Sequence, residues 1–321
     1  MSKVWRFGKV LPDVPSILKG PDWSQADPRW INRALAVTQS RPTGGWYVAD
    51  GSRAITDKPK RYRIMGKDWV LFRDAHGVIA GQDKCPHMGA SLADGHVHDG
   101  CVVCPWHALA LGRKKRGSWD PLKVHDDGIL VWVQLPDPNP TDAPFIAPRP
   151  ATYFDAVMRM EARCRPSDIV ANRLDPWHGA HFHPHSFGTL KIIERTDDDI
   201  TVRVAYRVVG KLAVEVDARF HSPEPNSIVM TIIGGEGVGS MVETHGSPVD
   251  NNHAAVIEAT IATSERPGFH TAVKWLGRWI RPAMEARASR LWVEDLAYAE
   301  RRQQLRDANE ADGNSDVIEP D

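Results

Sequence analysis

Three of the chain's four cysteines fall in two neighbouring stretches, "DKCPHMGASL" and "GCVVCPWHAL". Each stretch places a histidine two or three residues after a cysteine, so that Cys85 precedes His87 and Cys104 precedes His107. Four cysteines in 321 residues are too few for a disulfide scaffold, and we expect the protein in the reducing cytoplasm. In that compartment, clustered Cys and His side chains are more often metal ligands than disulfide bridges.

Two kinds of metal site fit these residues. A tetrahedral zinc ion would leave His87 unused and would take four ligands, Cys85, Cys101, Cys104 and His107. A [2Fe–2S] cluster would use both histidines, because Cys85 and Cys104 would hold one iron and the two imidazoles the other. Replacing two thiolates by neutral imidazoles raises the reduction potential from about −400 mV to roughly −150 to +300 mV. We favour the cluster, which leaves Cys101 as a buried bystander.

The first half of the chain is predicted to be an all-β module that follows an N-terminal arm, residues 1–42. "YRIMGKDWVLFRDAHGVIAG" is typical of a hairpin with its turn at Asp74 to Gly77. The module covers residues 43–150 and closes with the Pro-rich stretch "PDPNPTDAPFIAPRP", which we interpret as a linker.

The second half is predicted to be an α+β domain over residues 151–308, with Cys164 in its core. "DIVANRLDPWHGAHFH" has a helical pattern that Pro176 must interrupt or bend. Alternating apolar residues in "TVRVAYRVV" and "LAVEVDARF" predict an antiparallel sheet with one face buried. The chain turns helical from about Thr271, with a second helical stretch beyond Pro282, and we expect the acidic tail, residues 309–321, to be disordered.

A second set of possible ligands lies in "NRLDPWHGAHFHPH". A non-haem Fe(II) that activates O₂ requires two imidazoles and one carboxylate on one face, with the opposite face open. His178 and His183 are the candidate imidazoles, although His181 and His185 could substitute for them. Asp175 would accept a hydrogen bond from His178 and fix its orientation. Asn172 completes the pattern N-x-x-D-x-x-H-x-x-x-x-H, and the carboxylate must come from elsewhere in the chain.

Both motifs, in this order, resemble the terminal oxygenase component of Rieske non-haem iron oxygenases over roughly residues 43 to 305. The compact length is similar to the ketosteroid hydroxylase and aromatic O-demethylase type. The family usually has glycine directly after the second histidine of the cluster loops, whereas here Ala108 follows His107. The resemblance implies an N-terminal Rieske module and a helix-grip second domain. It places the carboxylate ligand at the E-D step of "LWVEDLAYAE", which favours Asp295 over its neighbour Glu294.

The resemblance also implies a head-to-tail homotrimer, in which Asp175 bridges His178 to His107 of the partner subunit. A separate NAD(P)H-dependent reductase, with or without a ferredoxin, would supply electrons, since the chain has no G-x-G-x-x-G nucleotide loop of its own. With O₂, the enzyme would hydroxylate, dealkylate or desaturate a small molecule. The basic run Arg113 to Arg116 is a candidate contact for an acidic ferredoxin.

The apolar face of the second domain's sheet favours an apolar substrate, such as an isoprenoid, steroid-like or aromatic compound. The net charge of −1 gives no reason to expect nucleic acid or an anionic membrane as a partner. No apolar run is long enough to span a bilayer. Two alternatives stay open: a Rieske-type electron-transfer protein without oxygenase activity, and a zinc-stabilised binding protein.

Overall fold

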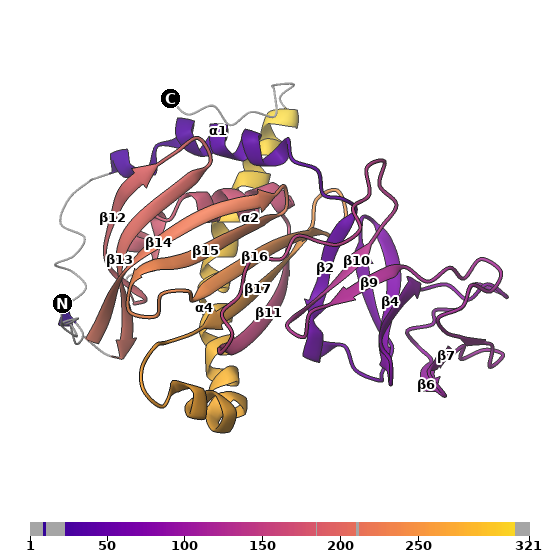
Figure 1. The fold of residues 1–321 in the computed structure, drawn as a ribbon. Coiled ribbons are helices and arrows are strands. Elements are labelled where there is room, and N and C mark those ends of the chain that lie inside the picture. The colour runs from indigo at the N-terminus through magenta and orange to yellow at the C-terminus, as the bar shows by residue number, and fades with distance from the viewer. Residues whose placement is uncertain (1–8, 11–22, 184, 210–211, 312–321) are drawn as a thin grey trace.

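The computed structural model describes residues 9–10, 23–183, 185–209 and 212–311. Two β-rich bodies lie side by side, an N-terminal module and a larger C-terminal domain with helices (Figure 1). This arrangement confirms the predicted α+β class. The expected N-terminal arm contains η2 (Trp23–Ala26) and α1 (Pro28–Gln39), and most of its other residues lie outside the described ones.

The N-terminal module consists of three small antiparallel sheets of three strands each. They contain β2 (Trp46–Gly51), β10 (Leu130–Gln134) and β9 (Lys123–Asp126); β3 (Lys60–Ile64), β4 (Lys67–Asp74) and β5 (Gly77–Gln82); and β6 (His96–His98), β7 (Cys101–Val103) and β8 (Ala110–Leu111). A short η3 (Ser52–Ala54) follows β2. The predicted hairpin is confirmed, because Asp74 at the end of β4 pairs with Gly77 at the start of β5.

The C-terminal domain is built on an eight-stranded antiparallel sheet. Its main path runs through β11 (Phe154–Ala162), β17 (Ala254–Ala262), β16 (Met241–Pro248), β15 (Ser227–Gly235), β14 (Leu212–Glu224), β13 (Asp199–Val209) and β12 (Phe187–Arg195), and β1 (Lys9–Val10) pairs with the start of β14. The predicted alternation holds in β13, where Val202 and Val204 are buried. Arg203 between them is exposed and pairs with Asp217 of β14.

The described part of the C-terminal domain also contains three helices: α2 (Pro166–Leu174), α3 (His178–Phe182) and α4 (Phe269–Ala311). Pro176 lies between α2 and α3, as expected of a residue that has no N–H to continue a helix. Pro282, in contrast, lies inside α4, where two stretches were expected. Pro282 is exposed, so water can bond the carbonyl that it leaves without a partner. α4 also extends past residue 308, and the rest of the expected tail lies outside the described residues.

The two bodies share one apolar core. Trp46, Leu130 and Trp132 of the N-terminal module are buried in the same cluster as Ile257 and Ile261 of β17. Ion pairs surround this contact: Arg149, in the segment between the bodies, binds Asp127 on one side and Glu243 of β16 on the other. A mixed apolar and charged interface therefore fixes the module against the sheet.

Asp155 on β11 gives a test of this interface. Its buried carboxylate accepts hydrogen bonds from Arg53 of η3 and from Arg281 of α4, with an Nη2–Oδ1 distance of 3.1 Å in each case. Asp155→Asn should lower the free energy of unfolding by about 1–3 kcal/mol, because it leaves two arginines without their anion. Asp217→Asn, which removes the partner of the exposed Arg203, should cost less than about 0.5 kcal/mol.

The pH dependence follows from the same contact. Burial opposes ionisation of Asp155, but Arg53 and Arg281 outweigh it and lower its pKa. The stabilisation is therefore complete above the pKa of an unfolded aspartate, about 3.9, and is lost as the pH falls through the lower folded value. Thermal unfolding of both variants should give the same difference in Tm at pH 6 and pH 8. If the difference in Tm between the two variants at pH 6 disappeared at pH 8, the role given to the Asp155 carboxylate would be contradicted.

Candidate metal centres

The two Cys/His stretches form a pair of matching loops at the end of the N-terminal module beside β6 and β7 (Figure 1). In the first loop the Cys85 N–H donates to the Ala90 carbonyl, and the Gly89 N–H donates to the Cys85 carbonyl. The second loop repeats this pattern with Cys104, Ala108 and Leu109. Each loop therefore turns back on its own cysteine, which holds the sulfur and the nearby histidine at a fixed separation.

The loops bury their cysteines and expose their histidines. Cys85 and Cys104 lie in an apolar core, and the exposed rings of His87 and His107 have centroids 4.7 Å apart. Burial opposes ionisation of Cys104, but the N–H groups of Trp106 and His107 outweigh it and lower its pKa. The N–H groups of His87 and Met88 also face Cys85, but there burial outweighs them and raises the pKa. Amides aimed at two adjacent sulfurs fit the thiolates of an iron–sulfur cluster.

The geometry does not form the alternative zinc site. A tetrahedral zinc ion needs ligand atoms within about 4 Å of one another, given bonds of 2.0–2.3 Å. Among the described residues, no three Cys or His side chains of the two loops have ligand atoms that all lie within 4.8 Å of one another. Cys101 is only half-buried, contrary to expectation, because β7 directs Val102 into the core and Cys101 to the other face, against Gly112. A two-iron cluster spans a wider ligand set.

Ala108 adopts the backbone conformation that the usual glycine would have in the second loop. Its φ is +55°, in the left-handed region, where the equivalent Gly89 has a φ of +79°. The loop therefore keeps its shape despite the side chain, at a cost of about 1–2 kcal/mol for a residue with a Cβ.

The second set of candidate ligands comes from three separate segments of the C-terminal domain. Asn172 lies in the last turn of α2, His178 begins α3, His183 directly follows it, and Asp295 lies on α4. The interruption at Pro176 turns α3 away from the direction of α2, so that both histidines face α4. The ligand atoms of His178, His183 and Asp295 lie within 4.8 Å of one another.

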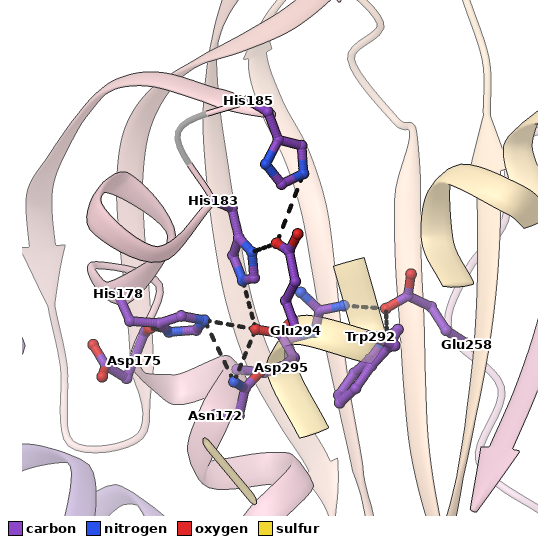
Figure 2. A network of polar contacts seen from close by, with 10 residues as sticks. Asn172, Asp175, His178, His183, His185, Glu258, Trp292, Glu294 and Asp295 are labelled. Carbon is purple, nitrogen blue, oxygen red and sulfur yellow. Dashed lines mark hydrogen bonds and ion pairs between the residues drawn. The ribbon is translucent and has the colours of Figure 1, made fainter. Parts of the chain in front are cut away.

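Asp295 Oδ1 is the point where these side chains meet (Figure 2). It lies 2.9 Å from His178 Nε2 and 2.6 Å from His183 Nε2, and it accepts a hydrogen bond of 3.2 Å from Asn172 Nδ2. Burial opposes ionisation of Asp295, but the two histidines and Arg173 hold its pKa far below the usual range. The pKa of His183 is raised overall: burial alone would lower it, but the contacts with Asp295 and Glu294 outweigh burial. A divalent cation can replace the protons that these groups share.

Glu294, the rival for the carboxylate ligand, faces the other side of His183. Its Oε2 lies 2.6 Å from His183 Nδ1 and 3.7 Å from His185 Nε2 (Figure 2). This is the position of a carboxylate that orients a metal-binding histidine rather than of a ligand on the same metal. His181, the other possible substitute, is exposed and packs edge-on against Trp177.

Asp175 contacts His178 differently from the expectation. His178 Nδ1 lies against the main-chain carbonyl of Asp175, and no bond joins the ring to the Asp175 carboxylate. That carboxylate is buried, and its Oδ1 has no hydrogen-bond partner among the described residues. The carbonyl of the residue before Pro176 is free to accept, because no helix continues through this position.

The three candidate ligands open onto a cavity of about 350 Å³. It lies between the sheet and helices α2, α3 and α4, and Val202, Val204 and Tyr206 of the sheet line it. Val216 of β14 packs in the adjacent core. A set of two imidazoles and one carboxylate on one side of such a cavity suits a non-haem ferrous ion with an open face.

The cavity wall also contains an ion pair that sequence reasoning missed. Arg173 of α2 binds Glu258 Oε2 of β17, and the same oxygen accepts a hydrogen bond of 2.6 Å from Trp292 Nε1. The available signal was Glu258 itself, an acidic residue within the apolar stretch "HAAVIEATIA". Its partner could not be read from the sequence, because Arg173 lies far away along the chain.

Comparison with known families accounts for nearly all of the described chain. Residues 45–126 match the Rieske [2Fe-2S] domain. Residues 135–310, more than half of the 321, match the family described as Domain of unknown function (DUF5914). Among the residues that the structure describes, no helix is both long enough and apolar enough to cross a bilayer.

Individual relatives are oxygenases. The chain is 40% identical to the vanillate O-demethylase oxygenase subunit of Pseudomonas sp. (strain HR199 / DSM 7063), over 51% of this chain and 53% of the relative. It is 31% identical to the 4beta-methylsterol monooxygenase of Methylococcus capsulatus, over 54% and 56%. The match therefore spans about half the length of these curated relatives.

A solved structure gives the fold at full length. Dicamba monooxygenase bound to dicamba superimposes with a TM-score of 0.66 at 19% identity, over 88% of this chain and 92% of that one. This likeness extends the shared architecture to both bodies. The chain therefore belongs to the DUF5914 family, carries a Rieske [2Fe–2S] domain, and is similar to the oxygenase components of Rieske systems.

Proposed function

We propose that the protein uses O₂ and externally supplied electrons to oxidise a largely apolar small molecule. The observation that carries this proposal is the convergence of His178, His183 and Asp295 on one side of the cavity. An electron carrier would need only the Cys/His loops, and a zinc-stabilised binding protein would need no iron at either site.

In this proposal Cys85, His87, Cys104 and His107 hold the cluster, and His178, His183 and Asp295 hold a ferrous ion. When bound, the cluster supplies single electrons and the ferrous ion supplies activation of O₂. The chain's own contribution is to place substrate beside the three ligands and to keep water out with apolar walls. The domains divide near residue 150, where the segment after β10 reaches β11.

Three further residues position the ferrous site. Asn172 donates to Asp295, and Glu294 holds the Nδ1 side of His183, so each ligand keeps one orientation. The Asp175 carbonyl does the same for His178. The Asp175 carboxylate, with one oxygen without a partner, is available to a histidine of a neighbouring copy.

We place the protein in a head-to-tail homotrimer. Figure 1 has β6 and β7, beside the Cys/His loops, at the end of the molecule remote from β12 and β13, which flank the cavity. Electron transfer from the cluster of one copy to the ferrous site of its neighbour shortens the path that the electron must cross. The electron donor is a separate reductase, with or without a ferredoxin. The basic run contributes less free charge than its sequence suggests, because Arg113 pairs with Asp74 and Lys115 with Asp120.

His178→Ala tests the ferrous site. The variant should keep the visible and EPR spectra of the cluster, lose the third iron per chain and lose turnover, because two remaining ligands bind Fe(II) weakly. His181→Ala is the matched control on the same helix, and it should retain iron and turnover. Oxygenated product from the His178 variant at the level of the control would refute the site.

Glu294→Gln tests the orientation of His183. Removing the carboxylate from Nδ1 should weaken metal binding about 10-fold or more, as loss of such a partner commonly does. Dialysis against Fe(II) or Co(II), followed by metal analysis and the Co(II) absorption spectrum, measures this without turnover. Glu285→Gln, earlier on α4, should bind metal as the parent does. Equal affinity in both variants would exclude the role given to Glu294.

Mixed trimers test the transfer between copies. A Cys85→Ser chain lacks a competent cluster, and a His178→Ala chain lacks the ferrous site, so each alone should be inactive. Co-expression should restore part of the turnover, because some neighbouring pairs then combine one intact cluster with one intact ferrous site. If mixed trimers form but show no turnover, electrons pass only between the two centres of the same chain, and transfer between copies is refuted.

A further inference from the structure

The cavity is apolar on most of its surface, yet it contains one buried pair of opposite charges. Glu258 is 3% exposed and the Arg173 side chain 17% exposed, and both line the same cavity as the three candidate iron ligands. A buried ion pair is costly to desolvate, and apolar residues of similar size often stabilise a fold as well or better. Stability alone therefore does not explain why the pair lies here.

The hydrogen bonds around this pair are unevenly distributed. Arg173, Trp292 and Thr244 all donate to Oε2 of Glu258, Thr244 at 3.3 Å. Oε1 accepts no hydrogen bond from any residue that the structure describes, and Figure 2 shows it directed away from these donors. Arg173 Nε is buried and has no partner within the described part of the chain. Glu258 Oε1 is thus the acceptor left over in the cavity wall, whereas the buried Arg173 Nε is enclosed by protein.

The charge of the pair restricts what can bind to it. Arg173 and Glu258 neutralise each other, so neither a carboxylate nor an ammonium group would find its charge compensated there. Burying such an uncompensated charge in an apolar cavity is strongly unfavourable. An ether or a ketone has no hydrogen to donate to Glu258 Oε1. A hydroxyl group donates its O–H and brings no charge.

We propose that the Arg173–Glu258 pair is a specificity site that anchors the single hydroxyl group of an otherwise apolar substrate. The hydroxyl donates to Glu258 Oε1, Arg173 keeps the site neutral overall, and the apolar body fills the cavity between the sheet and α4. This inference rests on the proposed function, because it assumes that the cavity is the substrate site. The pair selects a neutral alcohol against the corresponding acid, ether or hydrocarbon.

The test compares ligands that share a skeleton. Farnesol, its methyl ether and farnesoic acid form one series, and 2-naphthalenemethanol, its methyl ether and 2-naphthoic acid form the other. Titration calorimetry with the iron-loaded, cluster-containing protein, without reductase, gives each Kd. At least one alcohol should bind about 10-fold or more tightly than both its ether and its acid, as expected for hydrogen bonds to charged groups. Failure of both alcohols to exceed their ethers would overturn the proposal.

Two variants separate this specificity from a structural role. Glu258→Gln leaves the Arg173 charge uncompensated, so the acid should become the preferred ligand of its series. The double variant Arg173→Met, Glu258→Leu removes both charges, and the alcohol should then bind no better than the ether. The cluster spectrum and Tm of each variant report folding, and the double variant decides the matter if Glu258→Gln does not fold. An alcohol preference that survives the double variant would refute the site.

The same experiment keeps this inference distinct from the proposed function. With reductase, NAD(P)H and O₂ added, an alcohol that binds selectively but yields no oxygenated product would contradict the proposed oxygenase activity and leave the hydroxyl site standing. Oxygenated products formed from ethers and acids as readily as from alcohols, with equal affinities, would leave the oxygenase activity standing and exclude the hydroxyl site.

Discussion

The contact of Asp295 Oδ1 with His178 and His183 joins α4 to the short segment around α3, and the geometry of the proposed ferrous site depends on where α4 lies. Packing fixes that position: Trp292 and Ala299, one turn either side of Asp295, are fully buried against β11 and β17. Farther along, Arg306 of α4 binds Asp168 at the start of α2. A helix held at both its apolar face and its charged end gives the carboxylate one position, which is the preorganisation that a three-ligand metal site needs.

Charge balance is the second constraint on this region. Asp295 and Glu258 bring two negative charges into a largely apolar interior, and Arg173 compensates only one of them in the chain itself. His178 and His183 contact the other carboxylate, and a bound dication would compensate its charge. Glu294 lies at the edge, with its side chain 32% exposed, where its charge is partly solvated. One buried negative charge, that of Asp295, is therefore left without a compensating arginine, and a cation would bind favourably beside it.

The sequence predicted what local pattern and motif spacing determine. The hairpin at Asp74, the interruption at Pro176 and the buried face of β13 follow from turn chemistry, the missing proline N–H and period-two alternation. It did not predict contacts that depend on how distant segments pack. Asp175 contacts His178 through its main chain, and Arg173 finds Glu258 on a strand far along the sequence. The choice between Glu294 and Asp295 needed the rotation of α4, which a one-residue step along a helix changes by about 100°.

The interface between the two bodies bears on how electrons reach the ferrous site. A hinge that swung the Cys/His loops toward the cavity would have to open the core shared by Trp132, Ile257 and Ile261, and also break the pairs that Arg149 and Asp155 make. Separating large apolar side chains from a common core costs several kcal/mol, before the charged groups are counted. Domain motion within one chain is therefore an expensive way to bring the two centres together. In the proposed trimer, association of copies would achieve the same approach and leave the interface intact, since His87 and His107 are exposed.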